Sequence, residues 1–419
     1  MAEAGLAPVA ARRTTLAARF LAKARALPVE DPLRRAADAA VPPRLSSVTG
    51  WRAVGAEAWQ EAGVVAPIEP TPLPSTAPWA VIPSVIFDLE AGPRLPPGTS
   101  AATRRREASL HLSSLPQCAT WVWTDGSATG GVLDGGAGAW IEWPDGEHQE
   151  LRAPAGRLCS SYRAELIALR EAFTYLNDHP AHTEDPLVVC TDSQAALAAL
   201  RSGPAEQRTQ LNRAVWDALV RLTEDGSRQV RLQWVPAHCG LDGNERADTL
   251  AKEAATLPQE EVPVDTSTVH RAAARAAGAR TASQRPPGWF RSLMGVNRPP
   301  PVTGLDRQSA VDVHQLRAGH WSGSAHYMHR IGRNPDPGCD QCRDEACRGG
   351  RCPLCGEAAD TPQHILLRCP ALMELRFRMT GSIRCPSREE ARDSDYVAAM
   401  GAAARRMTSR EASRRQAPP

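Results

Sequence analysis

The chain has 419 residues, which predicts two to three domains at about 150 residues each. Its net charge of +2 is nearly neutral, so overall charge excludes a strongly basic or acidic protein, and only local patches could indicate nucleic acid. Hydrophobic residues make up 42% of the sequence, enough for a folded core, and no apolar run reaches the ~18 residues that span a membrane.

The 11 cysteines are an odd number and occur without a secretion signal, which favours a reducing compartment and metal binding over disulfides. We therefore expect an intracellular protein, nuclear or cytoplasmic. A mitochondrial presequence is the alternative interpretation of residues 1–27, which are amphipathic and carry arginine. Glu3 and the continuing helical pattern favour an ordinary helix there.

The first 115 residues predict a flank of two parts. Residues 1–40 are rich in Ala and Arg and indicate one or two helices. Residues 41–115 are punctuated by proline, which excludes long helices and central strands. We expect a helical segment followed by a Pro-rich spacer.

The region 116–258 has the clearest pattern of secondary structure. Successive strands are expected at 120–125, 139–143 and 148–153, with a Gly-rich loop at 126–138. Ser160 begins a helix, and strands 187–192 and 230–235 then alternate with further helices, one of them capped by Ser193. Three strands in succession indicate antiparallel pairing, and the alternating strands indicate parallel additions. The expected α/β fold is a mixed five-stranded sheet flanked by helices, with acids gathered in one cleft.

Four acids in this region suit a metal-dependent nuclease. They are Asp125 in WVWTDGS, Glu165 in SSYRAELIAL, Asp192 in VVCTDSQAAL and Asp248 in GNERADTLA. Mg²⁺ prefers carboxylate oxygens, and two ions about 3.5–4 Å apart can hold both the attacking and the leaving oxygen of a phosphodiester. Clustered carboxylates repel one another without cations, so the quartet implies bound metal.

These motifs, above all HCGLDGNERAD at 238–248, resemble the type 1 ribonuclease H family over residues 116–258. The resemblance implies a ribonuclease H-like fold and cleavage of the RNA strand of an RNA–DNA hybrid with two Mg²⁺ ions, leaving 5′-phosphate and 3′-hydroxyl ends. The bacterial form often carries a Lys-rich basic handle between its middle helices. The corresponding segment RSGPAEQRTQLNRAVW is not strongly basic, so another segment is expected to supply the grip on the substrate.

The chemistry of the residues suggests a role for each. Asp125, expected at a strand end, would bind both ions, and Glu165 and Asp192 would hold one each, with Glu165 also orienting the 2′-hydroxyl. Asp248 is expected on the first turn of its helix, where the dipole keeps it ionised. His238 would shuttle a proton, although an ordinary loop histidine is the alternative. Backbone and side-chain contacts to the substrate are expected from Gly126, Ser127, Ser193 and Gln194.

A second candidate metal site lies in the segment 331–385. The spacing of Cys352, Cys355, His364 and Cys369 suits tetrahedral zinc. Cys339 and Cys342, with Cys347 nearby, form a competing pair that could replace the first two ligands or help form a second site, and the sequence does not choose. Residues 259–330 are expected to be a linker or helical connector, and residues 386–419 a basic, disordered tail.

The region from LRAGHW at 316–321 to the Cys/His segment resembles the C-terminal part of non-LTR retrotransposon polyproteins. In those proteins a ribonuclease H follows a reverse transcriptase, which implies such a partner, in cis in a longer parent or in trans. The expected function is hybrid-specific endonuclease activity. One alternative is a non-catalytic retroelement relic that binds nucleic acid through the zinc segment and Arg tail, and another is a transposase-like DNA nuclease. The oligomeric state is not predicted.

Overall fold

A computed structural model describes residues 8–40, 50–72, 77, 79–96, 98–179, 185–224, 228–284, 287–295, 300–331, 333, 350–382 and 385–416, with side chains of the last helix described to Ser409. The chain forms two compact units. We call Arg13–Ala277 the N-terminal unit, and Met1–Arg12 together with Gly278–Pro419 the C-terminal unit. Within the described residues, no helix is both long and apolar enough to cross a bilayer.

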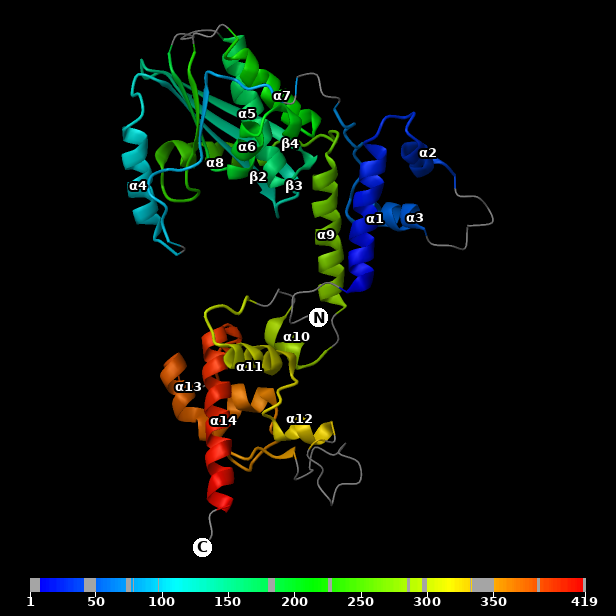
Figure 1. Ribbon diagram of the computed structural model, residues 1–419, viewed down its shortest axis with the longest axis vertical. Helices are drawn as coiled ribbons and strands as arrows, with labels where there is room; N and C mark the ends of the chain where they lie inside the picture. The colour runs from blue at the N-terminus through cyan, green and yellow to red at the C-terminus, as the bar shows by residue number, and fades with distance from the viewer. Residues whose placement is uncertain are drawn as a thin grey trace. The chain divides into compact units, whose positions relative to one another are not determined.

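The N-terminal unit is built on a mixed sheet with strand order β1-β6-β5-β2-β3-β4 (Figure 1). β2, β3 and β4 pair antiparallel, whereas β5, β6 and β1 are added in parallel. The strands are β1 (Val85–Asp88), β2 (Thr120–Thr129), β3 (Leu133–Glu142), β4 (His148–Leu158), β5 (Leu187–Thr191) and β6 (Val230–Trp234). The mixed α/β class is therefore confirmed, but the sheet has six strands and not the five expected.

The additional strand lies in the Pro-rich flank. β1 is only four residues long and pairs with β6 at the sheet edge, where neighbouring prolines are tolerated because one side needs no partner. The same flank contains α3 (Trp51–Glu61) and α4 (Ala101–Ser113), each free of proline. The expectation that this stretch excludes long helices was therefore wrong.

The predicted Gly-rich loop at 126–138 is mostly strand. β2 continues to Thr129 and β3 begins at Leu133, so only a tight turn remains, in which Gly130 and Gly131 adopt positive φ. The glycines of β3 serve a packing purpose. A Cβ on Gly136 would lie 2.1 Å from the carbonyl oxygen of Ala251, and one on Gly138 would lie 2.4 Å from that of Ala247. Because glycine has no Cβ, the helix that contains Ala247 and Ala251 can lie directly on the sheet.

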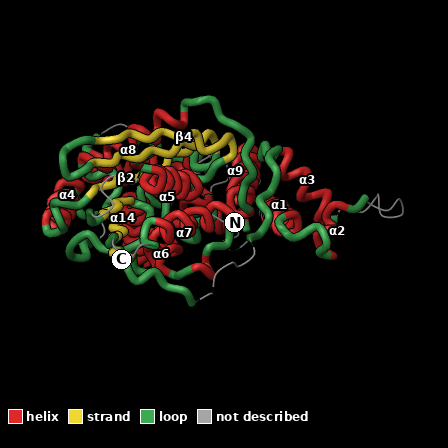
Figure 2. Tube along the Cα trace, turned by 90° about the horizontal axis from the view of Figure 1, so that it is seen from above, coloured by secondary structure: helices red, strands yellow, loops and turns green. Residues whose placement is uncertain are grey.

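Helices cover both faces of the sheet. On one face, Val122 and Val189 pack with Phe173 of α5 and Leu219 of α7. Figure 2 shows α5, α6 and α7 on the same side of the strands. On the other face, Val188 packs against α4, and α8 lies over the glycines of β3. These helices are α5 (Ser161–Asp178), α6 (Gln194–Arg201), α7 (Gln210–Arg221) and α8 (Asp242–Ala255).

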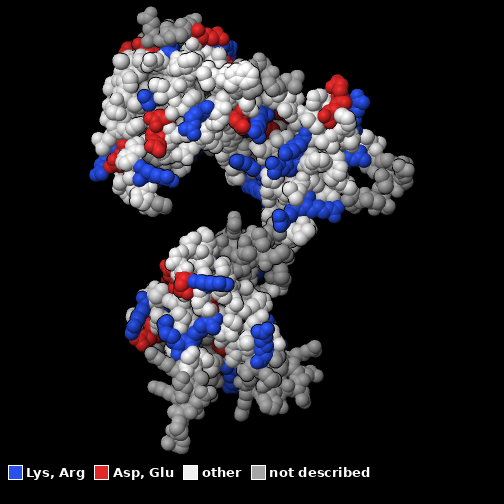
Figure 3. All heavy atoms as spheres, viewed as in Figure 1, with Lys and Arg blue, Asp and Glu red and all other residues white. Residues whose placement is uncertain are grey.

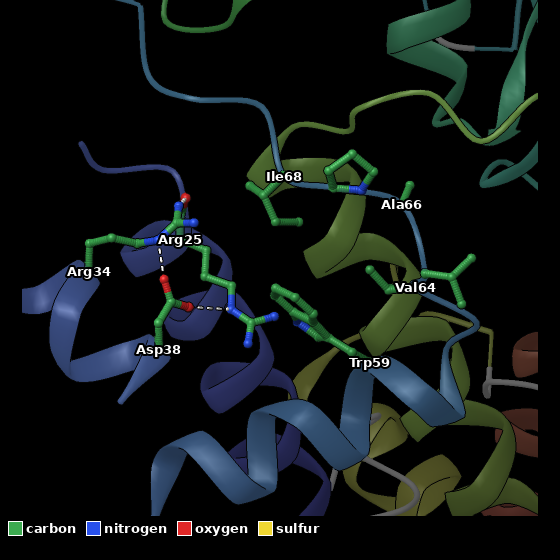
Figure 4. A pocket seen from close by; sticks show the side chains of 9 residues that line it. Arg25, Arg34, Asp38, Trp59, Val64, Ala66 and Ile68 are labelled. Atoms are coloured by element: carbon green, nitrogen blue, oxygen red, sulfur yellow. Dashed lines mark hydrogen bonds and ion pairs between the residues drawn. The ribbon is translucent and has the colours of Figure 1, made fainter. Parts of the chain in front are cut away.

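A second apolar cluster is built by α2 (Pro32–Asp38), α3 and the parts of α1 (Val9–Arg25) and α9 (Thr266–Ser283) that belong to this unit. It includes Trp59, Val264 and Val269 and reaches Leu158 at the end of β4. A pocket of about 320 Å³ opens beside Trp59 (Figure 4). Within it, Asp38 accepts hydrogen bonds from Arg25 at 3.2 Å and Arg34 at 2.5 Å, an ion pair that joins α1 to α2.

The C-terminal unit packs its Cys/His segment into a helical core. Its helices are α10 (Trp289–Met294), α11 (Arg307–Ala318), α12 (Ala325–Arg330), α13 (Met373–Thr380) and α14 (Ser394–Gln416). The predicted disordered tail is wrong for α14, which buries Val397 and Met400 against Leu316 and pairs Arg405 with Asp312 at 2.5 Å. The arginines of the tail suggested disorder, but its first half has an apolar face.

Candidate active site

Three of the four predicted acids come together over the middle of the sheet, where the central strand β5 ends beside β2. Asp125, Glu165 and Asp192 each offer a carboxylate oxygen, and these oxygens all lie within 4.8 Å of one another. The pairing of strands explains the meeting of the two aspartates. β2 and β5 run in parallel up to the pair Thr124 and Thr191, so the next residue of each strand emerges at the same point. Asp125 is therefore not at the end of β2, as expected, but where β5 leaves it.

Glu165 reaches the aspartates because α5 lies directly on β2. A Cβ on Gly126 would lie 2.2 Å from the backbone nitrogen of Glu165, so only glycine allows this approach. The first turn of α5 is capped by Ser160, whose hydroxyl accepts from the Arg163 N–H at 3.2 Å. The helix start predicted at Ser160 thus places a carboxylate one turn inside the helix, above the strand.

Two of the three carboxylates are buried without enough donors to satisfy them, and Asp192 is half-buried. Asp125 is 5% exposed and Glu165 9%. The Gly126 N–H donates to Oδ1 of Asp125 at 2.6 Å, but Oδ2 of Asp125 and Oε2 of Glu165 have no hydrogen-bond partner among the described residues. A buried anion without partners is costly, so the site favours an added cation or proton.

Burial and mutual repulsion raise the pKa values of all three acids. Burial, followed by the charges of Asp192 and Asp248, raises the pKa of Asp125 to about 7. Burial and then Asp125 and Asp192 raise the pKa of Glu165 well above its ordinary value. Burial also raises the pKa of Asp192, and the charge of His238 opposes it. The cluster would therefore bind protons or metal ions in competition near neutral pH.

Asp248 lies near this group, although its carboxylate oxygens are not within 4.8 Å of all three. Its charge contributes to the raised pKa values of Asp125 and Asp192, while its own Oδ2 accepts from Nζ of Lys252 at 2.5 Å. Because α8 begins at Asp242, Asp248 lies in the second helical turn. The expectation that it lies on the first turn, with support from the helix dipole, was wrong.

His238 is exposed on the loop between β6 and α8, in the left-handed conformation with φ of +48°. Few residues other than glycine adopt this conformation, so neighbouring contacts must hold it. The side chain of Glu245 accepts from the Gly240 N–H at 3.1 Å. Arg104 of α4 donates to the carbonyl of Ala237 at 3.3 Å. No sequence pattern predicts this support from α4, which lies more than 130 residues earlier.

Comparison with known proteins accords with this geometry. The RNase H family model matches residues 117–256. Ribonuclease H of Pectobacterium carotovorum is 32% identical over 147 residues, covering 33% of this chain and 90% of that protein. Ribonuclease HI of Synechocystis is 30% identical over 151 residues, covering 33% and 89%. The chain belongs to the ribonuclease H family. This membership confirms the predicted enzyme class, a hydrolase of the ribonuclease H type.

The predicted substrate contacts adjoin the carboxylates of the ribonuclease H domain. Gly126 and Ser127 follow Asp125 along β2, and Ser193 and Gln194 follow Asp192 at the start of α6. Ser193 occupies the N-cap position, but its hydroxyl makes no capping hydrogen bond, contrary to expectation.

The indole of Trp234 holds the backbone beside Asp192. Its Nε1 donates to the carbonyl of Asp192 at 3.1 Å, a contact that sequence reasoning missed. Trp234 is the last residue of β6, so this hydrogen bond joins the end of β6 to Asp192, the residue that follows the neighbouring strand β5.

A buried ion-pair network supports the start of α5 from outside the ribonuclease H match. Arg163, two residues before Glu165, donates to Glu69 and lies 3.8 Å from Asp265. Asp265 also accepts from the hydroxyl of Thr268 at 2.6 Å. That hydroxyl lies 3.1 Å from the hydroxyl of Ser160, the cap of α5. Both flanks of the ribonuclease H domain therefore help to position the helix that carries Glu165.

The predicted zinc ligands of the C-terminal unit also come together. Ligand atoms of Cys352, Cys355, His364 and Cys369 lie within 4.8 Å of one another. Sγ of Cys355 is 3.3 Å from Nε2 of His364. Burial lowers the pKa of His364, which favours the neutral imidazole that metals bind. The competing residues Cys339, Cys342 and Cys347 lie outside the described part of the chain.

Proposed function

We propose that this chain is an Mg²⁺-dependent endonuclease that cleaves the RNA strand of RNA–DNA hybrids by a two-metal mechanism. The main support for this proposal is the group of Asp125, Glu165 and Asp192. Two buried carboxylate oxygens in this group have no hydrogen-bond donor among the described residues. A hard divalent cation with oxygen ligands fits such a site. Membership of the ribonuclease H family supports the same substrate class.

The donor set suits Mg²⁺ better than a softer ion because it consists of oxygens only. Asp125 would be the ligand shared by two ions, with Glu165 and Asp192 holding one each. Asp248 would supply the fourth carboxylate from α8. Bound metal would activate the attacking water and stabilise charge on the phosphate oxygens.

The chain's own residues would orient the substrate and move a proton. Glu165 would accept a hydrogen bond from the 2′-hydroxyl, a group that only RNA offers, and so favour the RNA strand. Gly126 and Ser127 on β2, with Ser193 and Gln194 at the start of α6, would contact the sugar-phosphate backbone. His238 is exposed on its loop and could deliver a proton to the leaving oxygen.

The test is cleavage of an end-labelled RNA–DNA hybrid by the full chain in Mg²⁺. We expect RNA fragments with 3′-hydroxyl ends, and their loss in Asp192→Asn. Asp242→Asn, which alters an exposed acid at the start of α8, is the matched control and should cleave normally. Folded protein that yields no product would favour the non-catalytic relic, and cleavage of duplex DNA but not hybrid would favour a DNA nuclease.

We also propose that Cys352, Cys355, His364 and Cys369 hold one zinc ion, since three thiols and an imidazole are a usual structural zinc set. Elemental analysis of the purified chain should find zinc at about one ion per chain. Cys352→Ser should lower that ratio, whereas Cys385→Ser, which removes an exposed thiol outside the group, should not. Equal zinc in both variants would contradict this ligand set.

The succession of a ribonuclease H domain and a Cys/His group in one chain supports a further part of the proposal. The chain would derive from the C-terminal part of a non-LTR retrotransposon polyprotein, with its zinc segment binding nucleic acid. A reverse transcriptase would then be its partner, in a longer parent or as a separate chain. Binding of single-stranded RNA or DNA by the chain, lost in Cys352→Ser and kept in Cys385→Ser, would support this role.

A further inference from the structure

Two helices outside the ribonuclease H match carry positive charge only. The sequences of α1 and α9 contain eight Lys or Arg residues and no Asp or Glu, in a chain whose net charge is +2. The helices share one apolar cluster, to which α1 contributes Leu21 and Ala22 and α9 contributes Val269 and Ala273. Figure 3 shows basic side chains gathered over these two helices. Such asymmetry attracts a polyanion even when the whole protein is nearly neutral.

Arg275 places this charge beside the β2–β3 hairpin. Its Nη1 donates to the carbonyls of Thr129 and Gly130 at 3.4 and 3.5 Å. The same turn touches the start of α5, because the carbonyl of Gly131 accepts from the Ser161 N–H at 3.4 Å. The guanidinium therefore lies at a turn that leads along β2 to Asp125 and that contacts, through Ser161, the start of the helix that carries Glu165.

Arg271 is one helical turn before Arg275 and lies on the same face of α9. Burial raises the pKa of Tyr162 in the first turn of α5, and the charge of Arg271 is among the contributions that oppose it. Burial lowers the pKa of His270, and the charges of Arg19 on α1 and Arg271 lower it further. Arg19, Arg271 and Arg275 thus form one basic face, which continues from α1 across α9 to the hairpin.

This face is free to bind phosphate. All three arginines are exposed, and none forms an ion pair with a carboxylate in the part of the chain that the structure describes. By contrast, Arg208 in the connection between α6 and α7 is paired with Glu206 at 2.8 Å. The basic face is therefore the stronger attractor for a polyanion.

The separation from the carboxylates matches a short stretch of duplex. Gly130 lies five residues beyond Asp125, which is at most about 17 Å along a strand at ~3.4 Å per residue. Duplex phosphates follow one another by about 3.4 Å of axis on each strand, so about five base pairs span that distance. A hybrid lying over the carboxylates would therefore reach the basic face within at most about five base pairs.

We propose that the basic face formed by Arg19, Arg271 and Arg275 binds the phosphate backbone of the substrate hybrid about five base pairs from the cleavage site. This inference rests on the proposed hybrid nuclease function. It assigns substrate grip to helices that precede and follow the ribonuclease H domain. The contacts would be to phosphate, so they would be independent of sequence.

The test measures binding of a 20-base-pair hybrid in the catalytically inactive Asp192→Asn background, as a function of salt. Each phosphate contact contributes about 0.9 to the slope of log K against log salt, so Arg271→Gln with Arg275→Gln should reduce the slope by about 2. That corresponds to binding weaker on the order of tens of fold at 0.1 M salt. In the active background the same pair should raise KM more than it lowers kcat.

Two further variants serve as controls. Arg221→Gln removes an exposed arginine at the end of α7, near the end of α5 remote from Glu165, because Asn177 of α5 donates to Ala218 of α7. It should leave the affinity unchanged. Arg271→Lys with Arg275→Lys should keep most of the affinity, since a point charge suffices for phosphate.

The outcomes separate this inference from the proposed function. If the wild-type chain cleaves hybrid but the glutamine pair binds as tightly as Arg221→Gln, with an equal salt slope, the basic face is refuted and the nuclease stands. If the wild-type chain does not cleave hybrid, the function fails. A slope that still depends on Arg271 and Arg275 would then keep the face as a nucleic-acid binding surface.

Discussion

Replacing Asp125 by asparagine should stabilise the metal-free protein at pH 8 while removing its nuclease activity. The pKa of Asp125 rises from 3.8 to about 7, first because the carboxyl is buried and then because Asp192 and Asp248 are close. A pKa unit corresponds to about 1.4 kcal/mol, so keeping this group ionised costs about 4 kcal/mol of folding free energy. Asparagine carries no charge, although burying its unpaired amide costs about 1–3 kcal/mol. The net gain should be about 1–3 kcal/mol.

The sign of the pH dependence follows from the direction of the pKa change. The folded chain binds this proton more tightly than the unfolded chain, so the stabilising contribution is complete below about pH 4 and is lost as the pH rises through about 7. Between pH 5.5 and 8 the metal-free wild type should lose about 2 kcal/mol through this group alone. The raised pKa values of Glu165 and Asp192 act in the same direction.

The assay is denaturant unfolding in EDTA at pH 5.5 and pH 8, repeated with Mg²⁺. Asp242→Asn is the control, because that acid is 85% exposed and its loss should change little. Mg²⁺ should stabilise the wild type and leave Asp125→Asn almost unaffected. If Asp125→Asn is less stable than wild type at pH 8 in EDTA, or shows the same pH dependence, the electrostatic account of this site is wrong.

Three further substitutions test the supports of the site. His238→Ala should lower kcat at least tenfold, on the order of a proton-transfer contribution, while stabilisation by Mg²⁺ persists; loss of that stabilisation would make the histidine a metal-site residue instead. Arg104→Gln should lower kcat more than Arg106→Gln, since only the former bonds the loop of His238; equal rates would remove α4 from the mechanism. Gly126→Ala should lower the melting temperature and abolish activity, because its methyl group would collide with the backbone of Glu165, and a normal melting temperature would contradict the close approach.

The parts of the site predictable from sequence are those encoded by adjacent residues. Asp125, Glu165 and Asp192 each belong to a short motif, on β2, near the start of α5 and just after β5, and the parallel pairing of β2 with β5 makes two of these motifs neighbours. The position of Asp125 within its strand was not predictable in this way. Glycine after an aspartate usually signals a turn, whereas here Gly126 stays in the strand so that α5 can approach.

Features that depend on contacts between residues far apart in the chain could not be predicted from the sequence. β1 has four residues and becomes a strand only because β6 offers it an edge. Arg104 acts on a loop that lies 133 residues later. The pattern of its helix predicts an exposed Arg163, but in the fold Glu69, 94 residues earlier, lies against it and buries it. Periodicity describes one element at a time and does not report which elements will meet.

The enclosure of Arg163 sets the smallest fragment that could work alone. Trimming the chain to residues 117–256, the span shared with the bacterial enzymes, would discard both Glu69 and Asp265. These are the two carboxylates beside the guanidinium of Arg163, whose side chain is 9% exposed. The trim would also uncover this guanidinium and remove the apolar cluster that reaches Leu158, so α5 would lose both the ion pairs and the neighbouring packing that support its start. In the bacterial enzymes a span of this length makes up most of the protein. In this chain, a fragment that works alone would have to keep the segments on both sides of the ribonuclease H domain that contain Glu69 and Asp265.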